Sequence, residues 1–188
     1  MRYSMLAALA ALGFGGAAGA ADSYTLDPDH TFPRFEISHL GFSTHHGQFN
    51  KTKGKLVLDR AAGTGSVDIT VDTASISTGD PALEKHLRSD DFFNVAKFPA
   101  MSFRSRTFKF NGDMPVAALG ELTLLGVTRP LTLSISRVKC GPHPVLKKEE
   151  CGAEVSGTLK RSDFGMKAYV PLVGDEVTLH IQVEAYRD

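Results

Sequence analysis

Alternation of apolar and polar residues is the feature that most restricts the fold of this chain. In the stretch SVDITVD, Val67, Ile69 and Val71 alternate with polar residues, and LTLSIS (131–136) and EVTLHIQVEA (176–185) repeat the pattern. A period of two indicates β-strands with one buried face and one solvated face. Antiparallel sheets produce this pattern, whereas strands of a parallel sheet are usually buried on both faces. We therefore expect an all-β, antiparallel protein.

Turn residues divide the alternating sequence into short strands. Asn111-Gly112 is a strong hairpin signal, and RAAGTG (60–65) separates two further strands. Because one or two of the nine intervals may be bent or merged, we predict about eight strands in one domain, residues 22–188. The predicted intervals are 23–27, 32–39, 47–59, 65–77, 100–110, 115–124, 130–139, 152–161 and 175–186.

One segment has helical spacing instead. In GDPALEKHLRS, Asp80 can cap a helix whose first residue is Pro81, and Leu83 and Leu87 share one face. An all-β chain with one short inserted helix is typical of a closed barrel or a two-sheet sandwich. A closed barrel has the advantage that no sheet edge is exposed.

The N-terminal residues have the features of a secretory signal. Arg2 precedes the apolar run MLAALAALGFGGAAGA, and AGAAD offers small residues for cleavage near Ala20. The alternative, a membrane-spanning helix, is disfavoured because the run is short and contains several glycines. We therefore expect residues 1–20 to be a signal peptide and the protein to be periplasmic. Lys+Arg and Asp+Glu balance at 21 each, so no basic surplus indicates nucleic-acid binding.

The two cysteines, Cys140 and Cys151, bracket the loop sequence GPHPVLKKEE. In an exported protein this arrangement predicts a disulfide. The spacing is not Cys-x-x-Cys, which disfavours a redox pair. Zinc bound by both cysteines and His143 is a further, weaker alternative.

The stretch HLGFSTHHGQF contains His39, His45 and His46. His39 continues the apolar face of Phe35 and Ile37, while His45 and His46 are adjacent and point to opposite sides of an extended strand. The chain has neither His-x-His nor His-Glu-x-x-His, so we predict no metal site. It also lacks Gly-x-Ser-x-Gly and a nucleotide-binding glycine loop, which favours a binding protein over an enzyme.

The 12 phenylalanines leave two possibilities for the interior. A barrel of about eight strands can be filled by its own side chains or can hold one ligand. Alternation alone does not decide between a solid core and an apolar bore.

Four blocks, HLGFSTHHGQF, HLRSDDFFNVAKFPAMSF, GELTLLGVTRPLTL and KRSDFGM, resemble the YceI-like family of lipocalin-like periplasmic proteins. The likeness extends from about Tyr24 to Ala185. It implies a lipocalin-like antiparallel β-barrel that encloses a long isoprenoid, such as a quinone tail or a polyprenyl phosphate, with no other cofactor and no established catalytic reaction. The cysteine loop and Pro33 depart from the pattern of many relatives, and Pro33 predicts a strand that starts at an edge or after a bulge.

The resemblance also implies which residues could contact a ligand. His86 and Arg88 are candidates for the polar head group, although a solvated helix face is the favoured explanation of the two residues. The predicted apolar contacts are Phe35, Ile37, Leu40, Phe42, Phe49, Leu83, Leu87, Phe92, Phe93, Phe103, Leu122, Leu124 and Phe164.

Two other functions remain open from the sequence. One is an enzyme that acts on such a lipid with His39 or His86 as acid or base. The other is a stress-response module with a solid core that binds no ligand. A lipid carrier could also touch a membrane or a membrane redox protein transiently, and could form a homodimer.

Overall fold

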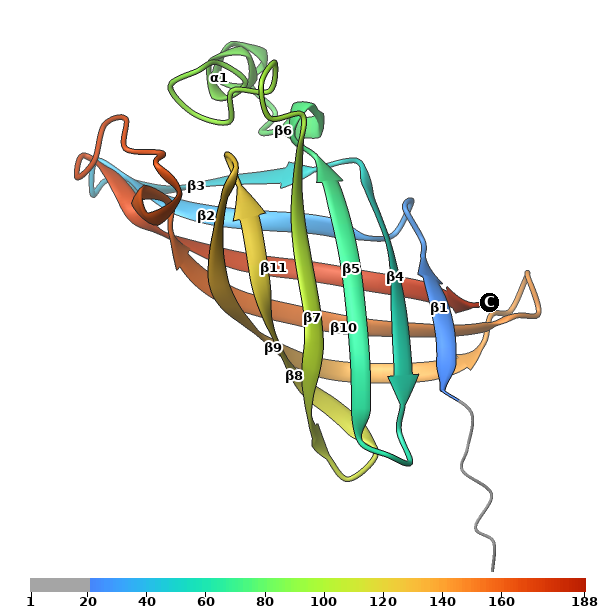
Figure 1. The fold of residues 1–188 in the computed structure, drawn as a ribbon. Helices are drawn as coiled ribbons and strands as arrows, with labels where there is room; N and C mark the ends of the chain where they lie inside the picture. The colour runs from blue at the N-terminus through green and yellow to red at the C-terminus, as the bar shows by residue number, and fades with distance from the viewer. Residues whose placement is uncertain (1–20) are drawn as a thin grey trace, which may run out of the picture.

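A computed structural model describes residues 21–188; the predicted signal peptide, 1–20, lies outside them. Within this part the chain is almost entirely β-structure (Figure 1). None of its helices is long and apolar enough to cross a membrane. In chain order the elements are β1 (Asp22–Leu26), β2 (Phe32–His39), β3 (Ser43–Phe49), β4 (Thr52–Asp59), β5 (Thr64–Asp72), η1 (Thr73–Ser75), β6 (Ile76–Ser77), α1 (Pro81–Leu87), β7 (Ala100–Asn111), β8 (Met114–Leu124), β9 (Val127–Pro142), β10 (Glu149–Lys160), η2 (Arg161–Phe164) and β11 (Val173–Arg187).

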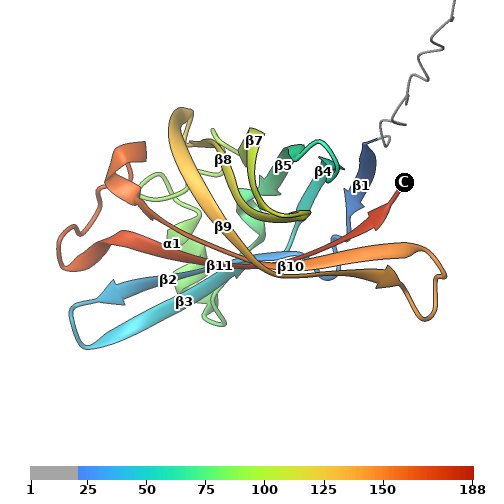
Figure 2. The same ribbon diagram turned by 90° about the horizontal axis from the view of Figure 1, so that it is seen from below.

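The sheet closes on itself through β1. The order β1-β4-β5-β7-β8-β9-β10-β11 is completed by pairing of β1 with β11, and every pairing is antiparallel. In Figure 2, β4, β5, β7 and β8 lie on one side and β10, β11, β2 and β3 on the other. The predicted closed barrel of eight strands with one short helix is therefore confirmed, and a two-sheet sandwich is excluded.

Three strands of the barrel are bent, and β2, β3 and β6 are parts of these bent strands. β1 and β2 both pair with β11, because Leu26 of β1 faces Ala185 and Phe32 of β2 faces Gln182. The bends between β3 and β4 and between β5 and β6 lie side by side, because the Asn50 N–H donates to the Ser75 carbonyl at 3.1 Å. The predicted continuous strands 47–59 and 65–77 were thus wrong at these bends.

Helix α1 begins as its sequence predicts. The Asp80 carboxylate accepts hydrogen bonds from the N–H groups of Ala82 (2.9 Å) and Leu83 (3.3 Å), which have no partner inside the helix. Pro81 occupies the first turn, where its missing donor is not needed. The helix lies across one end of the barrel (Figure 1).

The opposite end is filled by side chains and joined by the disulfide. Tyr24 and Ala185 are almost fully buried there, together with Leu26 and Cys151. Cys140 of β9 and Cys151 of β10 face each other and are bonded at 2.05 Å, so the predicted disulfide is confirmed. We call this filled end the closed end. At the other end, within residues 21–188, α1 and its neighbouring loops lie between the interior and solvent.

Candidate ligand-binding site

An apolar cavity of about 440 Å³ occupies the barrel between the closed end and α1. Cavities of about 300–1,000 Å³ are typical of small-molecule sites. It extends from Thr31 and Thr52, at the bends of the strands, to Leu83 and Leu87 of α1. The interior is therefore hollow along part of its length, which answers the question that alternation left open.

The walls come from the inward face of each alternating strand. Residues that are two apart in sequence point to the same side, so β5, β7, β8, β9 and β11 each contribute a row of side chains. These rows consist of Ile69 and Val71, Met101 and Phe103, Leu122 and Leu124, Leu131 and Leu133, and Val177, Leu179, Ile181 and Val183. The chemistry of the walls suits a hydrocarbon chain and offers few hydrogen-bonding groups.

The cavity is blind toward the closed end. Tyr24 is fully buried beneath it, and its hydroxyl donates to the Glu149 carboxylate at 3.1 Å. Burial, followed by the nearby Glu149, raises the pKa of Tyr24. Ile69 and Val183 pack against the Tyr24 cluster and also line the cavity, so no passage continues between them.

Aromatic side chains surround the mouth near α1. The ring centroids of His86 and Phe92 are 5.0 Å apart in an edge-on arrangement, and Tyr169 stacks on Phe92 at 6.2 Å. His86 Nε2 lies 3.7 Å from a carboxylate oxygen of Asp91. The mouth thus combines apolar rings with one polar pair at the solvent boundary, which is where a ligand's polar head group would lie.

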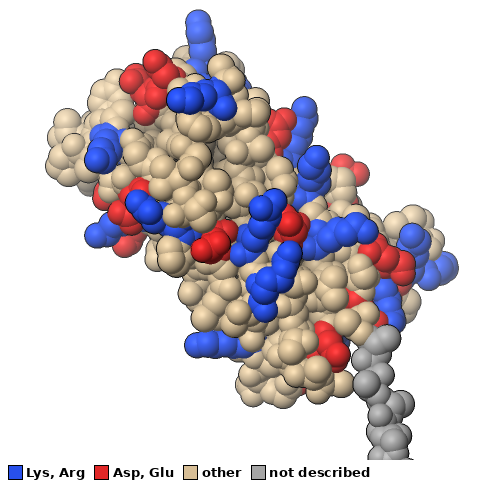
Figure 3. All heavy atoms as spheres, viewed as in Figure 1, with Lys and Arg blue, Asp and Glu red and all other residues tan. Residues whose placement is uncertain are grey.

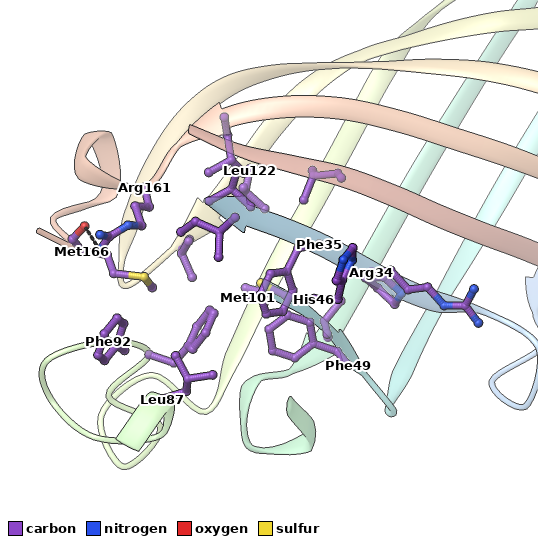
Figure 4. Close-up of a pocket in the computed structure, with 18 of the residues that line it drawn as sticks. Arg34, Phe35, His46, Phe49, Leu87, Phe92, Met101, Leu122, Arg161 and Met166 are labelled. Atoms are coloured by element: carbon purple, nitrogen blue, oxygen red, sulfur yellow. Dashed lines mark hydrogen bonds between the residues drawn. The ribbon is translucent and has the colours of Figure 1, made fainter. Parts of the chain in front are cut away.

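Further inside, Phe35, Phe49 and Met101 lie together (Figure 4). Phe49 contacts Phe35 and the edge of Phe93, with ring centroids 6.0 Å and 5.3 Å apart. This cluster joins β2 and β3 to the segment that follows α1, and it forms the side of the cavity that the bent strands supply.

A buried arginine beside the cavity was not predicted from the sequence. Arg161 is 2% exposed, and its guanidinium donates to the carbonyls of Gly174, Met166, Ala168 and Val173 at 2.8–3.1 Å. Figure 4 shows the bond to Met166. Burial lowers the pKa of Arg161, and the charge of Asp175 opposes this effect. The arginine therefore fixes the loop of residues 165–172 at the mouth, and its position at the end of an alternating strand was the signal that could have indicated it.

Most predicted contact residues lie on the cavity. Those that line it are Phe35, Ile37, Leu40, Phe49, Leu83, His86, Leu87, Phe92, Phe93, Phe103, Leu122 and Leu124. Sequence reasoning missed Met101, Met166, Tyr169 and the whole row on β11, although the alternation of β11 was evident.

Three predicted residues lie elsewhere. Phe42 is 91% exposed at the β2–β3 turn, and Phe164 is buried in the core outside the cavity. Arg88 donates to the carbonyls of Ala74 (2.9 Å) and Ile76 (2.7 Å), so it holds α1 on the barrel and does not face the mouth.

The three neighbouring histidines form no common ligand set. His39 and His45 stack with ring centroids 4.2 Å apart at the rim, whereas His46 Nδ1 lies 3.4 Å from Glu36. Two clusters with ligand atoms near one another occur within residues 21–188, and neither contains these histidines. One is Cys140, Glu149 and Cys151, whose sulfurs form the disulfide, and the other is Asp27, His30 and Glu184 at the closed end.

This chain is similar to curated relatives over nearly its whole length and to solved structures over 81–88% of its length. A UPF0312 protein of Pseudomonas aeruginosa is 40% identical over 193 residues, covering 100% of both chains. Protein YceI of Escherichia coli O157:H7 is 36% identical, covering 98% of this chain and 97% of that protein. The YCEI protein of Campylobacter jejuni is 29% identical with a TM-score of 0.65, covering 81% and 90% of the two chains.

Two more distant structures share the fold. BcnA of Burkholderia cenocepacia is 20% identical with a TM-score of 0.71, covering 85% and 98% of the two chains. A polyisoprenoid binding domain from Saccharophagus degradans is 17% identical with a TM-score of 0.65, covering 88% and 98%. The model of the YceI-like domain matches residues 24–185. This chain therefore belongs to the YceI-like family.

Proposed function

We propose that this protein binds a long isoprenoid lipid in the cavity and carries or stores it in the periplasm. The observation that supports this most is a blind, apolar cavity of about 440 Å³ inside a closed barrel. The Saccharophagus degradans domain with the same fold is described as polyisoprenoid binding.

The physical argument rests on the shape and the chemistry of the walls. Each CH₂ group that leaves water for an apolar site contributes about 0.8 kcal/mol, so a few isoprene units outweigh the ordering cost of a flexible chain. A ligand with polar groups along its length would lose hydrogen bonds to water without replacement on these walls. The blind end favours a ligand whose hydrocarbon tail enters first.

The mouth then receives the head group. His86 and Tyr169 lie at this boundary, and His86 is near Asp91. We assign these side chains to hydrogen bonding with the head group of a quinone or a phosphate. Catalysis by His86 is not proposed, because this half-exposed pair lies outside the apolar interior.

Extraction of the purified protein with organic solvent, followed by mass spectrometry, tests the proposal. We expect an isoprenoid lipid at up to one molecule per chain. In a Leu122→Trp variant, the larger ring would occupy the cavity and the recovered lipid would fall at least about tenfold. A Val116→Trp variant on the exposed part of the same strand is the matched control and should retain the lipid.

Recovery of no isoprenoid from cells that make such lipids would contradict the proposal. Equal recovery from the Leu122→Trp variant, with its fold verified by circular dichroism, would show that any lipid is bound outside the barrel.

A further inference from the structure

Five of the eight exposed large apolar side chains in residues 21–188 lie beside the mouth. Leu40 and Phe42 belong to the β2–β3 turn, and Tyr169, Val170 and Leu172 belong to the loop after η2. The Leu40 N–H donates to the Leu172 carbonyl at 2.8 Å, so the two loops form one surface, here called the apolar tip. Figure 1 shows these loops next to each other at the same end of the molecule as α1.

The apolar tip is not explained by the stability of the fold. Phe42 is 91% exposed and Leu172 is 65% exposed, so neither gains much from burial within the chain. Leu40 (φ 54°) and Tyr169 (φ 61°) adopt the left-handed backbone region, which glycine and asparagine occupy at much lower cost. An exposed patch of large apolar side chains is typical of an interaction site.

The two loops of the apolar tip carry few charged side chains. Residues 37–49 and 164–174 contain no aspartate or glutamate, but they contain Lys167 and three histidines. The space-filling view shows mostly tan atoms beside the α1 end, with acidic and basic side chains at the top of the view (Figure 3). Nearby carboxylates lie beside histidines: Asp91 is 3.7 Å from His86 on the α1 side, and Glu36 is 3.4 Å from His46 on the β2–β3 hairpin. Exposed Phe, Leu and Tyr side chains with a flanking lysine are typical of segments that rest in the interface of a bilayer.

The tip is also continuous with the cavity. Leu40, Tyr169 and Leu172 are exposed to solvent and line the cavity as well. A bilayer that covers the tip would therefore meet the mouth directly, and a hydrocarbon chain could pass between the two without crossing water.

We propose that the apolar tip inserts into the interface of a phospholipid bilayer and that the ligand enters and leaves the cavity there. A bilayer is favoured over a protein partner because the apolar side chains project from two loop tips and carry no carboxylate between them. The transfer of the ligand rests on the proposed function, whereas insertion of the tip can be tested without any isoprenoid.

A single introduced tryptophan gives a direct test, because the chain has no tryptophan. The Phe42→Trp variant is mixed with vesicles of phosphatidylethanolamine and phosphatidylglycerol. We expect its fluorescence to shift to shorter wavelength and to be quenched by brominated acyl chains. A Val145→Trp variant is the matched control, because Val145 is 77% exposed in the loop between β9 and β10, away from the mouth. Its fluorescence should not change.

Charge substitutions test whether the tip drives the binding. The double variant Phe42→Asp/Leu172→Asp should bind these vesicles at least about tenfold more weakly in a flotation assay, since two apolar contacts are lost. The control Val145→Asp/Leu146→Asp should float like the unmodified protein. Mass spectrometry must show the same N-terminus in all samples, so that residues 1–20 contribute equally.

The outcomes separate the two proposals. Equal flotation of both double variants, or no response of the Phe42→Trp variant, would overturn insertion of the tip. A Phe42→Asp/Leu172→Asp variant that floats normally but loses a co-purifying protein would assign the tip to that protein instead. Vesicle binding with no extractable isoprenoid would leave tip insertion standing and contradict the proposed function alone.

Discussion

The closed end and the mouth of the barrel are built from the same alternating strands but have opposite designs. At the closed end, Tyr24 and Ala185 fill the interior, and the disulfide joins β9 to β10. Arg187 pairs with Asp22, so the two terminal strands are also joined on the surface. At the mouth, side chains line a cavity, and Leu40 and Tyr169 hold strained backbone positions.

One end of the barrel therefore contributes mainly to stability, and the other end provides the binding site. Side chains that meet in the middle stabilise the closed end, whereas the mouth leaves apolar surface uncovered until a ligand arrives. Because unfilled apolar surface forfeits packing contacts, the mouth should contribute less to the free energy of unfolding than the closed end.

The largest difference should appear when one aromatic ring is removed at each end. Tyr24→Ala creates a new buried cavity and should lower the free energy of unfolding of lipid-free protein by about 3–5 kcal/mol. Phe35→Ala enlarges a cavity that already exists and should lower it by less than about 2 kcal/mol. Denaturant titration measures both. Equal losses would contradict the contrast between the two ends.

Removal of the disulfide tests the closed end alone. The double variant Cys140→Ala/Cys151→Ala should lose about 2–3 kcal/mol of stability, since the short loop no longer restricts the unfolded chain. Affinity for the isoprenoid ligand should stay within about twofold, because neither cysteine lines the cavity. A large loss of affinity without a loss of stability would show that the two ends are coupled.

At the mouth, Arg161→Lys should lower the stability of the protein less than removal of the disulfide does, but it should loosen the nearby loop measurably. Lysine has three donors on one nitrogen and cannot reproduce the planar fork that binds four carbonyls, so we expect a loss of about 1–2 kcal/mol. Limited proteolysis should cut residues 165–172 faster, while the closed end keeps its protection against hydrogen exchange. Unchanged proteolysis would contradict the role of Arg161 in fixing this loop.

The smallest effect concerns Glu184 at the closed end. Burial, then the neighbouring Glu150 carboxyl, raises the pKa of Glu184 above its ordinary value of 4.5. The folded protein therefore holds this proton more tightly, and the contribution of Glu184 to stability falls as the pH rises from about 4.5 through the folded pKa. Glu184→Gln should remove this decline. The change should stay below about 1 kcal/mol, because the side chain is more than a third exposed.

The pKa of Asp27 is shifted in the opposite direction to that of Glu184, so Asp27 serves as the control. Burial tends to raise its pKa, but hydrogen bonds from His30, the Asp29 N–H and Tyr186 lower it overall. Its contribution is present above pH 3.8, the ordinary value, and is lost as the pH falls through the lower folded pKa. Asp27→Asn should therefore flatten the acid side of the stability curve, measured by thermal unfolding between pH 2 and pH 7. A similar change in both variants would contradict these assignments.

Alternation, turn residues and capping residues predicted the antiparallel strands, the hairpins and α1, since these are local properties of the sequence, whereas the choice of a barrel over a sandwich rested on the family resemblance. The bends were not predicted, although a signal was present. The buried residues Phe49 and Leu58 are an odd number of positions apart, as are Val71 and Ile76. The inward face therefore changes phase within 47–59 and within 65–77, which a straight strand does not allow.

The cavity could be predicted only in part, because its presence depends on how far apart the two sides of the barrel lie. Phe42 was assigned to it as an apolar residue of a block that resembles the family, but it follows the turn at Leu40 and Gly41, where the strand reverses direction. Arg88 has suitable spacing for a head-group contact, but its bonds to Ala74 and Ile76 depend on tertiary packing. Local sequence patterns thus assign residues to strands, but they do not determine how deeply each side chain is buried.

Binding of prenyl alcohols of increasing chain length to lipid-free protein, measured by calorimetry, tests the hollow apolar bore most directly. Each added isoprene unit should tighten binding by at least about tenfold until the cavity is full, after which the affinity should level off. The Leu122→Trp variant should reach this plateau with a shorter chain. An affinity that does not depend on chain length, in the unmodified protein or in this variant, would contradict a ligand inside the barrel.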